Sequence, residues 1–238
     1  MKVAIHQPQY FPWPPYVHKV MSADIFVYLD TVQFSKNGLQ NRNQIKTAQG
    51  PMWLTIPVRQ HLGQSISETE IADHRAIEKH WKTLIANYSR TPGFERWREE
   101  LQALLSTSAG SLADLAIAST EWILRKLQVQ NKRIRASEVP EAEGHASKLV
   151  ASICGALNAT EYLTGTGALN YLDRKDFDAI DCKVMVQHWQ PFQYEQAYER
   201  AGFVSDLSTL DLLLNCSESA RGLIAAAGSW EPLQTNND

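Results

Sequence analysis

Short apolar runs alternate with segments of helical periodicity along most of the chain. The first runs cover residues 3–5 and residues 24–30, and the second is apolar until its final carboxylate, Asp30. Such uninterrupted runs are typical of strands buried on both faces of a parallel sheet. Between them, prolines at residues 14 and 15 favour an extended approach to a short helix over residues 16–22. The start of the chain therefore predicts a β-α-β unit with parallel strands.

The same alternation continues to the end of the chain. A polar segment, residues 31–50, contains part of a hairpin. Further strands are expected over residues 53–58, 133–137, 161–165 and 183–187, and helices over residues 74–88, 94–105, 111–127, 145–157, 208–215 and 219–227. This order predicts an α/β fold: a doubly wound, mostly parallel sheet with helices on both faces and a helical insertion around residues 74–127. We expect one domain over residues 1–230 and a polar tail over residues 231–238.

Composition narrows the class of protein. The chain has 238 residues, of which 44% are hydrophobic, and a formal net charge of −3. This balance supports a folded core and gives no reason to expect general nucleic-acid binding, which needs a basic face. The first apolar run is too short for a signal peptide, and no run approaches the roughly 20 apolar residues of a membrane span. We therefore expect a cytoplasmic protein.

Cysteine and histidine spacing predicts neither disulfides nor a metal site. The cysteines stand at residues 154, 182 and 216, an odd number at wide spacing, which fits neither a disulfide framework nor a zinc site. The seven histidines have no helical pairing and no acidic partners at ligand spacing. We expect no bound metal.

Polar residues follow the predicted strands at their carboxyl ends, where ligands bind in sheets of this kind. This rule places His6, Asp30, Ser137 and Gly165 along one edge of the sheet. His6 is expected either to act as a general acid or base near neutral pH or to tether the proline-rich loop after it. Asp30 either orients His6, contacts a substrate amine or hydroxyl, or caps the following turn.

The polar segment after the second strand carries a dense group of cations and amides, namely Lys36, Asn41, Arg42, Asn43 and Lys46. Guanidinium and ammonium groups bind phosphate or carboxylate, and asparagine adds neutral donors and acceptors. The alternative is a solvated loop with surface charges. Nearby aromatic rings, those of Tyr10, Trp13 and Tyr16, either form a platform for a sugar or base or pack in the core.

Cys216 follows an apolar helix, and a helix C-terminus raises the pKa of a thiol. A buried core thiol is therefore favoured; if His6 packs against Cys216, a thioester route becomes available. Asp211 shares that helix with Asn215 at i, i+4 spacing. Lys79 and His80 form either a basic contact or part of a solvated helix face. Gly165 and its neighbour at 167 allow a ligand to approach the backbone but lack the third glycine of a dinucleotide fingerprint.

The most specific group of residues in the first fifty positions is His6-Gln7-Pro8-Gln9-Tyr10-Phe11-Pro12-Trp13, Lys19, Gln33, Lys36, Gln40-Asn41-Arg42-Asn43 and Lys46, followed further along by Lys79-His80, Gly165, Asp211 and Cys216. Together these residues resemble the WbqC-like family of bacterial O-antigen and surface-glycan gene clusters, and the resemblance spans nearly the whole chain. It implies substrate binding by Gln7, Tyr10, Trp13, Lys19, Gln33, Lys36, Asn41, Arg42, Asn43, Lys46, Lys79, His80, Gly165 and Asp211. The chain departs from the family pattern at Pro15, Leu39 and Ser217.

The family context implies three hypotheses. The first is a transferase that adds an acyl or aminoacyl group to an amino sugar or similar amine, taking it from a carrier-protein or coenzyme A thioester or from an aminoacyl-tRNA. Its partners would be a small-molecule or nucleotide-sugar substrate and an acyl carrier protein. The second is an ATP-dependent adenylating or nucleotidyl-transferring enzyme, because the opening also looks distantly like nucleotidyltransferase-type α/β enzymes; however, His18 lies too far from His6 for their His-x-x-His pair. The third is a non-catalytic binding subunit of the pathway.

Overall fold

A six-stranded mixed sheet, with strand order β10-β9-β8-β1-β2-β7, forms the centre of the protein. The computed structural model describes residues 1–106 and 110–234. The strands are β1 (Lys2–His6), β2 (Ile25–Tyr28), β7 (Lys132–Arg135), β8 (Glu161–Thr164), β9 (Lys183–Trp189) and β10 (Gly228–Pro232). All neighbouring pairs are parallel except β9 and β10. The sheet is thus mostly parallel, as predicted.

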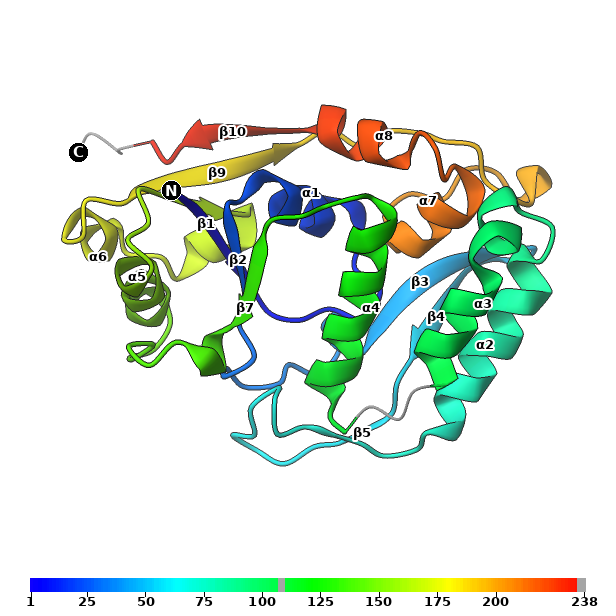
Figure 1. The fold of residues 1–238 in the computed structure, drawn as a ribbon, viewed down its shortest axis with the longest axis horizontal. Coiled ribbons are helices and arrows are strands. Elements are labelled where there is room, and N and C mark those ends of the chain that lie inside the picture. Colours follow the sequence, from blue (N-terminus) through cyan, green and yellow to red (C-terminus); the bar gives the residue numbers. More distant parts are fainter. Residues whose placement is uncertain (107–109, 235–238) are drawn as a thin grey trace.

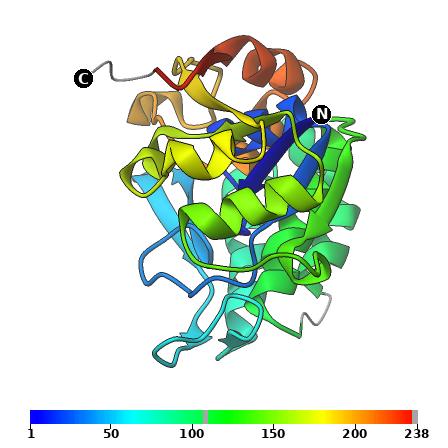
Figure 2. The same ribbon diagram turned by 90° about the vertical axis from the view of Figure 1, so that its left-hand side faces the viewer.

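Helices cover both faces of this sheet, because alternate strand residues point to opposite sides. Ala4 and Phe26 belong to a core packed under α1 (Pro14–Ser22) and α4 (Leu112–Lys126). Val3 and Val27 belong to a second core, packed under α5 (Ser147–Ala156) and α6 (Arg174–Asp178). The two pairs of helices lie on opposite sides of the strands in Figure 1, and α5 crosses in front of them in Figure 2. The predicted doubly wound α/β fold is confirmed.

Helix α1 begins two residues earlier than its prolines predicted. The sequence favoured an extended segment at residues 14 and 15, whereas Pro14 and Pro15 form the first turn of the helix after Trp13 as N-cap. Proline is tolerated there because the first N–H groups of a helix have no intrahelical partner, and its fixed φ suits a helix. The structure therefore corrects the predicted helix start.

The chain between β2 and β7 is larger than the helical insertion predicted at residues 74–127. It contains β3 (Arg42–Thr47), β4 (Gly50–Thr55), β5 (Val58–Arg59), β6 (Glu70–Ile71), α2 (Arg75–Tyr88), α3 (Pro92–Ser106) and α4. The strand expected over residues 53–58 is divided between β4 and β5. Residues 107–109 of the predicted insertion lie outside the described residues. Helix α7 (Thr209–Asn215) packs on α3, α4 and β3, so a segment from near the end of the chain joins this part to the sheet.

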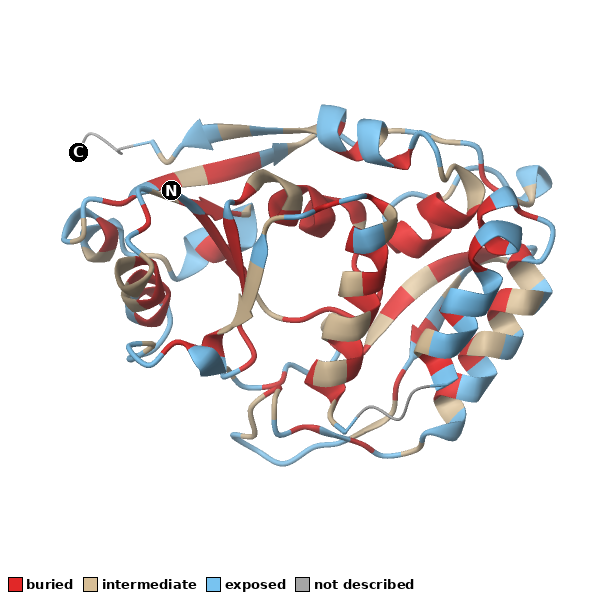
Figure 3. Cartoon of the chain, viewed as in Figure 1, coloured by how far each residue is buried: buried red, intermediate tan, exposed pale blue. Residues whose placement is uncertain are grey.

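Where α7 meets α3, α4 and β3, each of these elements contributes buried side chains. Figure 3 shows buried residues concentrated on α7 and on the inner sides of α3 and α4. Gly93 in α3 permits the close crossing, because a Cβ there would stand 2.3 Å from the Leu213 carbonyl oxygen. No helix in residues 1–106 or 110–234 is long and apolar enough to cross a membrane.

Strand β10 was not predicted, and it moves the start of the predicted polar tail. Glu231 and Pro232, assigned to the tail, pair with β9 opposite Val186 and Met185. Strand β10 follows α8 (Ala220–Ala227) directly, and Gly228 lets it pass over His18, since a Cβ at Gly228 would stand 2.3 Å from that ring. Residues 235–238 lie outside the described residues. Short 3-10 helices occupy Ala136–Glu138 (η1), Thr166–Asn170 (η2) and Glu199–Ala201 (η3).

Candidate functional site

The connections of the sheet reverse direction between β1 and β8. From β1 the chain adds β2 and β7 on one side, with α1 and α4 on one face; it then adds β8 and β9 on the other side, with α5 and α6 on the opposite face. The crossovers therefore diverge at the carboxyl ends of β1 and β8. A crevice at such a switch point is the place where open α/β sheets bind ligands.

A cavity of about 250 Å³ occupies this position. We call it the switch-point pocket. It is lined by Ile5, His6, Gln7, Lys19, Leu29, Val150, Tyr162, Thr164, Gly165, Gly167, Ala168 and Tyr171. Four of these, His6, Gln7, Lys19 and Gly165, were expected from the sequence to serve the site. The structure brings those four together.

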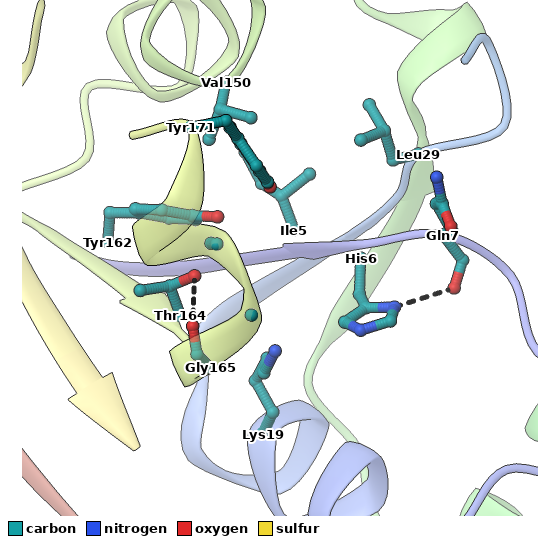
Figure 4. Close-up of a pocket in the computed structure, with 12 residues that line it drawn as sticks. Ile5, His6, Gln7, Lys19, Leu29, Val150, Tyr162, Thr164, Gly165 and Tyr171 are labelled. Carbon is teal, nitrogen blue, oxygen red and sulfur yellow. Dashed lines mark hydrogen bonds between the residues drawn. The ribbon is translucent and has the colours of Figure 1, made fainter. Parts of the chain in front are cut away.

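Lys19 enters the pocket from α1 as a buried cation. Its side chain is only 5% exposed, and its amine would stand 3.4 Å from a Cβ placed on Gly165. None of the described residues forms a hydrogen bond or an ion pair with this amine. Burial lowers the pKa of Lys19 to about 8, since an ammonium group is less stable away from water. Figure 4 shows the amine lying beside Gly165 and facing the open space of the cavity.

His6 faces the same space from the end of β1. Its Nδ1 lies 3.1 Å from the Gln7 carbonyl oxygen, which can only accept, so Nδ1 carries the proton and Nε2 keeps its lone pair. The ring stands edge-on to Tyr16, with 4.9 Å between centroids. Burial and then the charge of Lys19 lower the pKa of His6 to about 3, against the opposing effect of the Gln7 carbonyl. His6 is therefore a neutral imidazole at neutral pH, and its bond to the Gln7 carbonyl also ties it to the proline-rich loop.

Gln7 connects the pocket to the polar segment after β2. Its Oε1 accepts a hydrogen bond of 2.7 Å from Gln40 Nε2, and Gln40 Oε1 in turn accepts from the Ser35 backbone N–H at 2.9 Å. The loop around Ser35 is thereby anchored to one wall of the pocket. The exposed side chains of this loop, Gln33 and Lys36, lie outside the pocket lining.

The sequence reasoning did not identify the apolar wall of the pocket. Val150 from α5, Tyr162 from β8 and Tyr171 after η2 line it, and burial raises the pKa of both tyrosines, which therefore remain neutral. Thr164 hydroxyl lies at the end of β8, beside Gly165. The strand order would have revealed these residues, since Tyr162 and Thr164 precede Gly165 on the strand that flanks the switch point.

Asp30 does not orient His6. Its carboxylate is fully buried and accepts hydrogen bonds from the Ser137 backbone N–H at 3.1 Å and from the Ser137 hydroxyl at 2.9 Å. These bonds hold the start of η1 after β7, which is 107 residues along the chain and is not the turn following Asp30 that the sequence offered for it to cap.

The asparagines of the polar segment support backbone rather than line the pocket. Asn41 donates to the Ile56 carbonyl at 2.8 Å, and Asn43 donates to the Phe11 carbonyl at 2.7 Å. Arg42, between them, lies over the ring of Trp53 at 4.3 Å and donates to the Asn37 carbonyl. The amides point inward and the guanidinium outward because β3 alternates its faces.

Lys46 and Asp211 also lie away from the pocket, in a buried network. Asp211 accepts hydrogen bonds from the hydroxyls of Tyr88 and Tyr194 and from the Lys46 backbone N–H. Burial raises the pKa of Asp211, and these hydroxyls, the Lys46 N–H and the Lys46 charge oppose that rise. The network holds α7 against β3 and α2.

The structure gives no contact between Cys216 and His6. The Cys216 thiol donates to the Glu195 carbonyl at 3.4 Å, and Cys216 lines a separate surface depression with Tyr194. Burial raises its pKa. The condition set for the thioester route, packing of His6 against this thiol, is not met.

The remaining residues predicted to bind substrate either pack inside the protein, outside the pocket lining, or lie on its surface. Tyr10 is buried and pairs with His80 Nδ1 at 3.0 Å, and burial lowers the pKa of His80 to about 4. Tyr16 is buried in the core, and Trp13 is half-buried at the start of α1. Lys79 is exposed on α2. Within the described part of the chain, no group of three or more histidine, cysteine or acidic side chains is placed to hold a metal ion.

Strand order and pocket together define a doubly wound α/β protein with its ligand crevice at the strand switch point. Comparison with known families is more specific: a family model described as the WbqC-like protein family matches residues 7–222. The chain belongs to this family, as the resemblance of its residues predicted. It is 32% identical over 223 residues to the uncharacterized protein Rv1507c of Mycobacterium tuberculosis (strain ATCC 25618 / H37Rv), covering 92% of this chain and 95% of that protein. No solved structure matches the chain.

Proposed function

We propose that this protein is a transferase that adds an acyl or aminoacyl group to the amine of an amino sugar or similar compound, in glycan or secondary-metabolite biosynthesis. The observation that carries the proposal is that the switch-point pocket is lined by both a neutral His6 and a buried Lys19, whose amine has no partner in residues 1–106 or 110–234. Acyl transfer needs a group that accepts a proton from the amine and a cation that stabilises the developing oxyanion. The two side chains have these chemical capacities.

In the proposed step, the amine nitrogen of the acceptor attacks the carbonyl carbon of the donor thioester or ester. The C–N bond forms, negative charge develops on the carbonyl oxygen, and the Lys19 ammonium stabilises it. His6 Nε2 takes the proton released by the amine and returns it to the departing thiolate or alkoxide when the C–S or C–O bond breaks. Burial is the larger cause of the lowered pKa of His6, and the charge of Lys19 is the second. A negative charge next to Lys19 offsets this second cause, so His6 becomes a stronger base as the oxyanion forms.

A second candidate, an ATP-dependent adenylating or nucleotidyl-transferring enzyme, is favoured by the strand order. Nucleotides bind at the switch point of doubly wound sheets, and Lys19 together with the glycines at 165 and 167 lies where phosphates would be held. Pyrophosphate release from ATP in the presence of a carboxylic acid would distinguish this candidate from the first, whose donor already carries an activated acyl group.

The test is a thermal-shift panel of coenzyme A thioesters, nucleotide-linked amino sugars and ATP, followed by mass spectrometry for amide formation with the ligands that bind. A ligand at 100 times its dissociation constant adds about 2.7 kcal/mol to stability. We expect shifts with a thioester and an amino sugar, and amide formation by the unmodified protein.

The matched variants separate catalysis from structure. His6→Asn keeps a donor for the Gln7 carbonyl but removes Nε2, so amide formation should fall at least tenfold while binding persists. Lys82→Ala, on the exposed face of α2, is the control and should leave both unchanged. A shift with ATP alone, with pyrophosphate release, would favour the second candidate. Binding without any reaction would indicate a binding subunit.

A further inference from the structure

The charges that line the switch-point pocket are unbalanced. Lys19 supplies a cation, and none of the twelve lining residues, all of them described, is acidic. A buried charge is normally paired, because separation from water is unfavourable unless an opposite charge replaces the lost hydration. The ligand is therefore expected to bring a negative or strongly polar oxygen to Lys19. An ammonium group in the same cavity would meet a like charge and no carboxylate.

The rest of the lining is divided into two ends. Figure 4 shows Lys19, Thr164 and His6 around one end of the cavity, and Val150 and Tyr171 at the other. Ile5 and Leu29 extend the apolar end. A ligand that satisfies both ends is amphipathic: an oxygen-bearing head at Lys19 and an apolar body toward Val150.

The volume limits the size of that body. The volume of about 250 Å³ lies below the roughly 300–1,000 Å³ typical of small-molecule sites. An acyl chain of about four to six carbons is a group of the size that such a pocket encloses. The remainder of a larger substrate would lie outside the pocket.

We propose that the switch-point pocket selects a small, apolar acyl group that carries no ammonium group, with its carbonyl oxygen against Lys19. The donor is then a simple acyl thioester rather than an aminoacyl ester. This inference rests on the proposed function and names the substrate class of the same site. The free acid is a suitable probe, because its carboxylate resembles the charge that develops on the carbonyl oxygen during transfer.

Proton linkage gives an independent readout of where the carboxylate binds. Pairing with an anion raises the pKa of Lys19 from about 8 toward its ordinary value, so binding above that pH takes up protons. The titratable groups that face Lys19 are His6, Tyr162 and Tyr171; all three are neutral at this pH and contribute no competing charge. At pH 8.5 we expect uptake of roughly half a proton or more per ligand, and almost none at pH 6.5.

The experiment is isothermal titration calorimetry of the full chain with 3-methylbutanoate, its amide, leucine and inorganic phosphate. 3-Methylbutanoate should bind at least tenfold more tightly than the other three. Lys19→Met should remove that preference and the proton uptake at pH 8.5, and Lys82→Met, an exposed control on α2, should keep both. Gly167→Leu is a second variant, because Gly167 lines the pocket and a Cβ there meets no atom within 4 Å. Its side chain should narrow the pocket and weaken the binding of 3-methylbutanoate at least tenfold.

If leucine bound as tightly as 3-methylbutanoate, the inference would be overturned in favour of an aminoacyl group. Tighter binding of phosphate would overturn it in favour of a phosphate site, and no binding of 3-methylbutanoate to the unmodified protein would overturn it outright. The proposed function would fail by a different result. In that case 3-methylbutanoate would bind with the stated preference, but no thioester would react to give an amide. Amide formation without binding of the acid would defeat the inference alone.

Discussion

Two polar regions of this protein carry the same kinds of side chain and use them in opposite ways. In the switch-point pocket, Lys19 and the Nε2 atom of His6 face a cavity and have no hydrogen-bond partner among the described residues. In the segment around β3, Asn41 and Asn43 donate to backbone carbonyls, and Asp211 accepts from two tyrosines. Asn41 Oδ1 and Arg42 Nε are buried there without a partner in the described part of the chain. The first region therefore leaves a cation and an imidazole nitrogen free to meet a ligand in a cavity, whereas the second uses its asparagine amides and the Asp211 carboxylate to join β3 to its neighbours.

The difference indicates which region is built for a ligand. Paired buried groups stabilise a fold, because their hydrogen bonds replace those lost to water. An unpaired buried cation does the reverse, and proteins keep such groups chiefly at sites where a ligand completes them. Residue type alone does not separate the two regions; the partner of each polar atom does.

The largest effect that would sharpen this comparison is an increase in the stability of the folded protein when the charge of Lys19 is removed. Lys19→Met replaces a buried ammonium with an apolar side chain of similar length, and we expect the free energy of unfolding at pH 7 to rise. Lowering a lysine pKa from 10.5 to about 8 corresponds to roughly 3 kcal/mol of destabilisation below pH 8. Denaturant unfolding of both proteins at pH 7 measures the gain.

The pH dependence of that gain identifies its cause. Between about pH 8 and 10.5 the unfolded chain holds a proton on Lys19 that the folded chain has released, so the unmodified protein becomes relatively more stable as pH rises through this window. The advantage of Lys19→Met should therefore shrink from pH 8 to 10.5. A loss of stability in Lys19→Met at pH 7 would mean that the cation has a partner, and the comparison would fail.

The matching change in the second region should destabilise. Asn43→Ala leaves the Gln44 N–H without its side-chain partner and removes one of two side-chain hydrogen bonds to the buried Phe11 carbonyl, the other coming from the Ser208 hydroxyl. We expect a loss of about 1–3 kcal/mol. The folded variant should keep its affinity for pocket ligands. Denaturant unfolding gives the first quantity and calorimetry the second; a large loss of affinity with unchanged stability would make Asn43 a ligand contact instead.

Hydrophobic patterning predicted the fold well, because strands of a parallel sheet that are buried on both faces leave uninterrupted apolar runs such as residues 25–29. It missed β10, whose residues are largely exposed and which follows a helix without a break, so neither periodicity nor turn residues mark it. It also began α1 too late, because the preference of proline for extended structure outweighed its tolerance in a first helical turn.

The site was predictable only in part. His6 and Gly165 could be assigned to the ligand edge because each ends a predicted strand. The order of the strands could not be assigned, and without it Val150, Tyr162 and Tyr171 had no reason to be grouped. The backbone partners of Asn41 and Asn43 could not be predicted for another reason: whether an amide at the start of β3 faces a ligand or a carbonyl depends on the face it occupies, and strand register is a tertiary property.

A smaller effect concerns His6 in acid. The folded protein holds the pKa of His6 at about 3 against an ordinary value of 6.5, so the unfolded chain binds an extra proton between these values, and stability falls as pH drops below 6.5. His6→Asn should make this fall shallower, by about 1 kcal/mol between pH 6.5 and 5, since His6 is half-buried and screened by solvent. His80, whose pKa is also lowered, contributes equally to both proteins. If the free energy of unfolding fell equally with pH in the two proteins, the lowered pKa of His6 would be contradicted.

The smallest expected effect tests the surface of the second region. Arg42→Ala removes a guanidinium that lies over the Trp53 ring and bonds to the Asn37 carbonyl, on a ring that is 43% exposed. Such a contact contributes about 0.5–1 kcal/mol at an exposed site. We expect a loss of that size in unfolding and no change in the affinity of the switch-point pocket for 3-methylbutanoate. If Arg42→Ala instead weakened binding as strongly as Lys19→Met, the polar segment would belong to the ligand site, and the contrast between the two regions would have to be replaced by one continuous binding surface reached through Gln40 and Gln7.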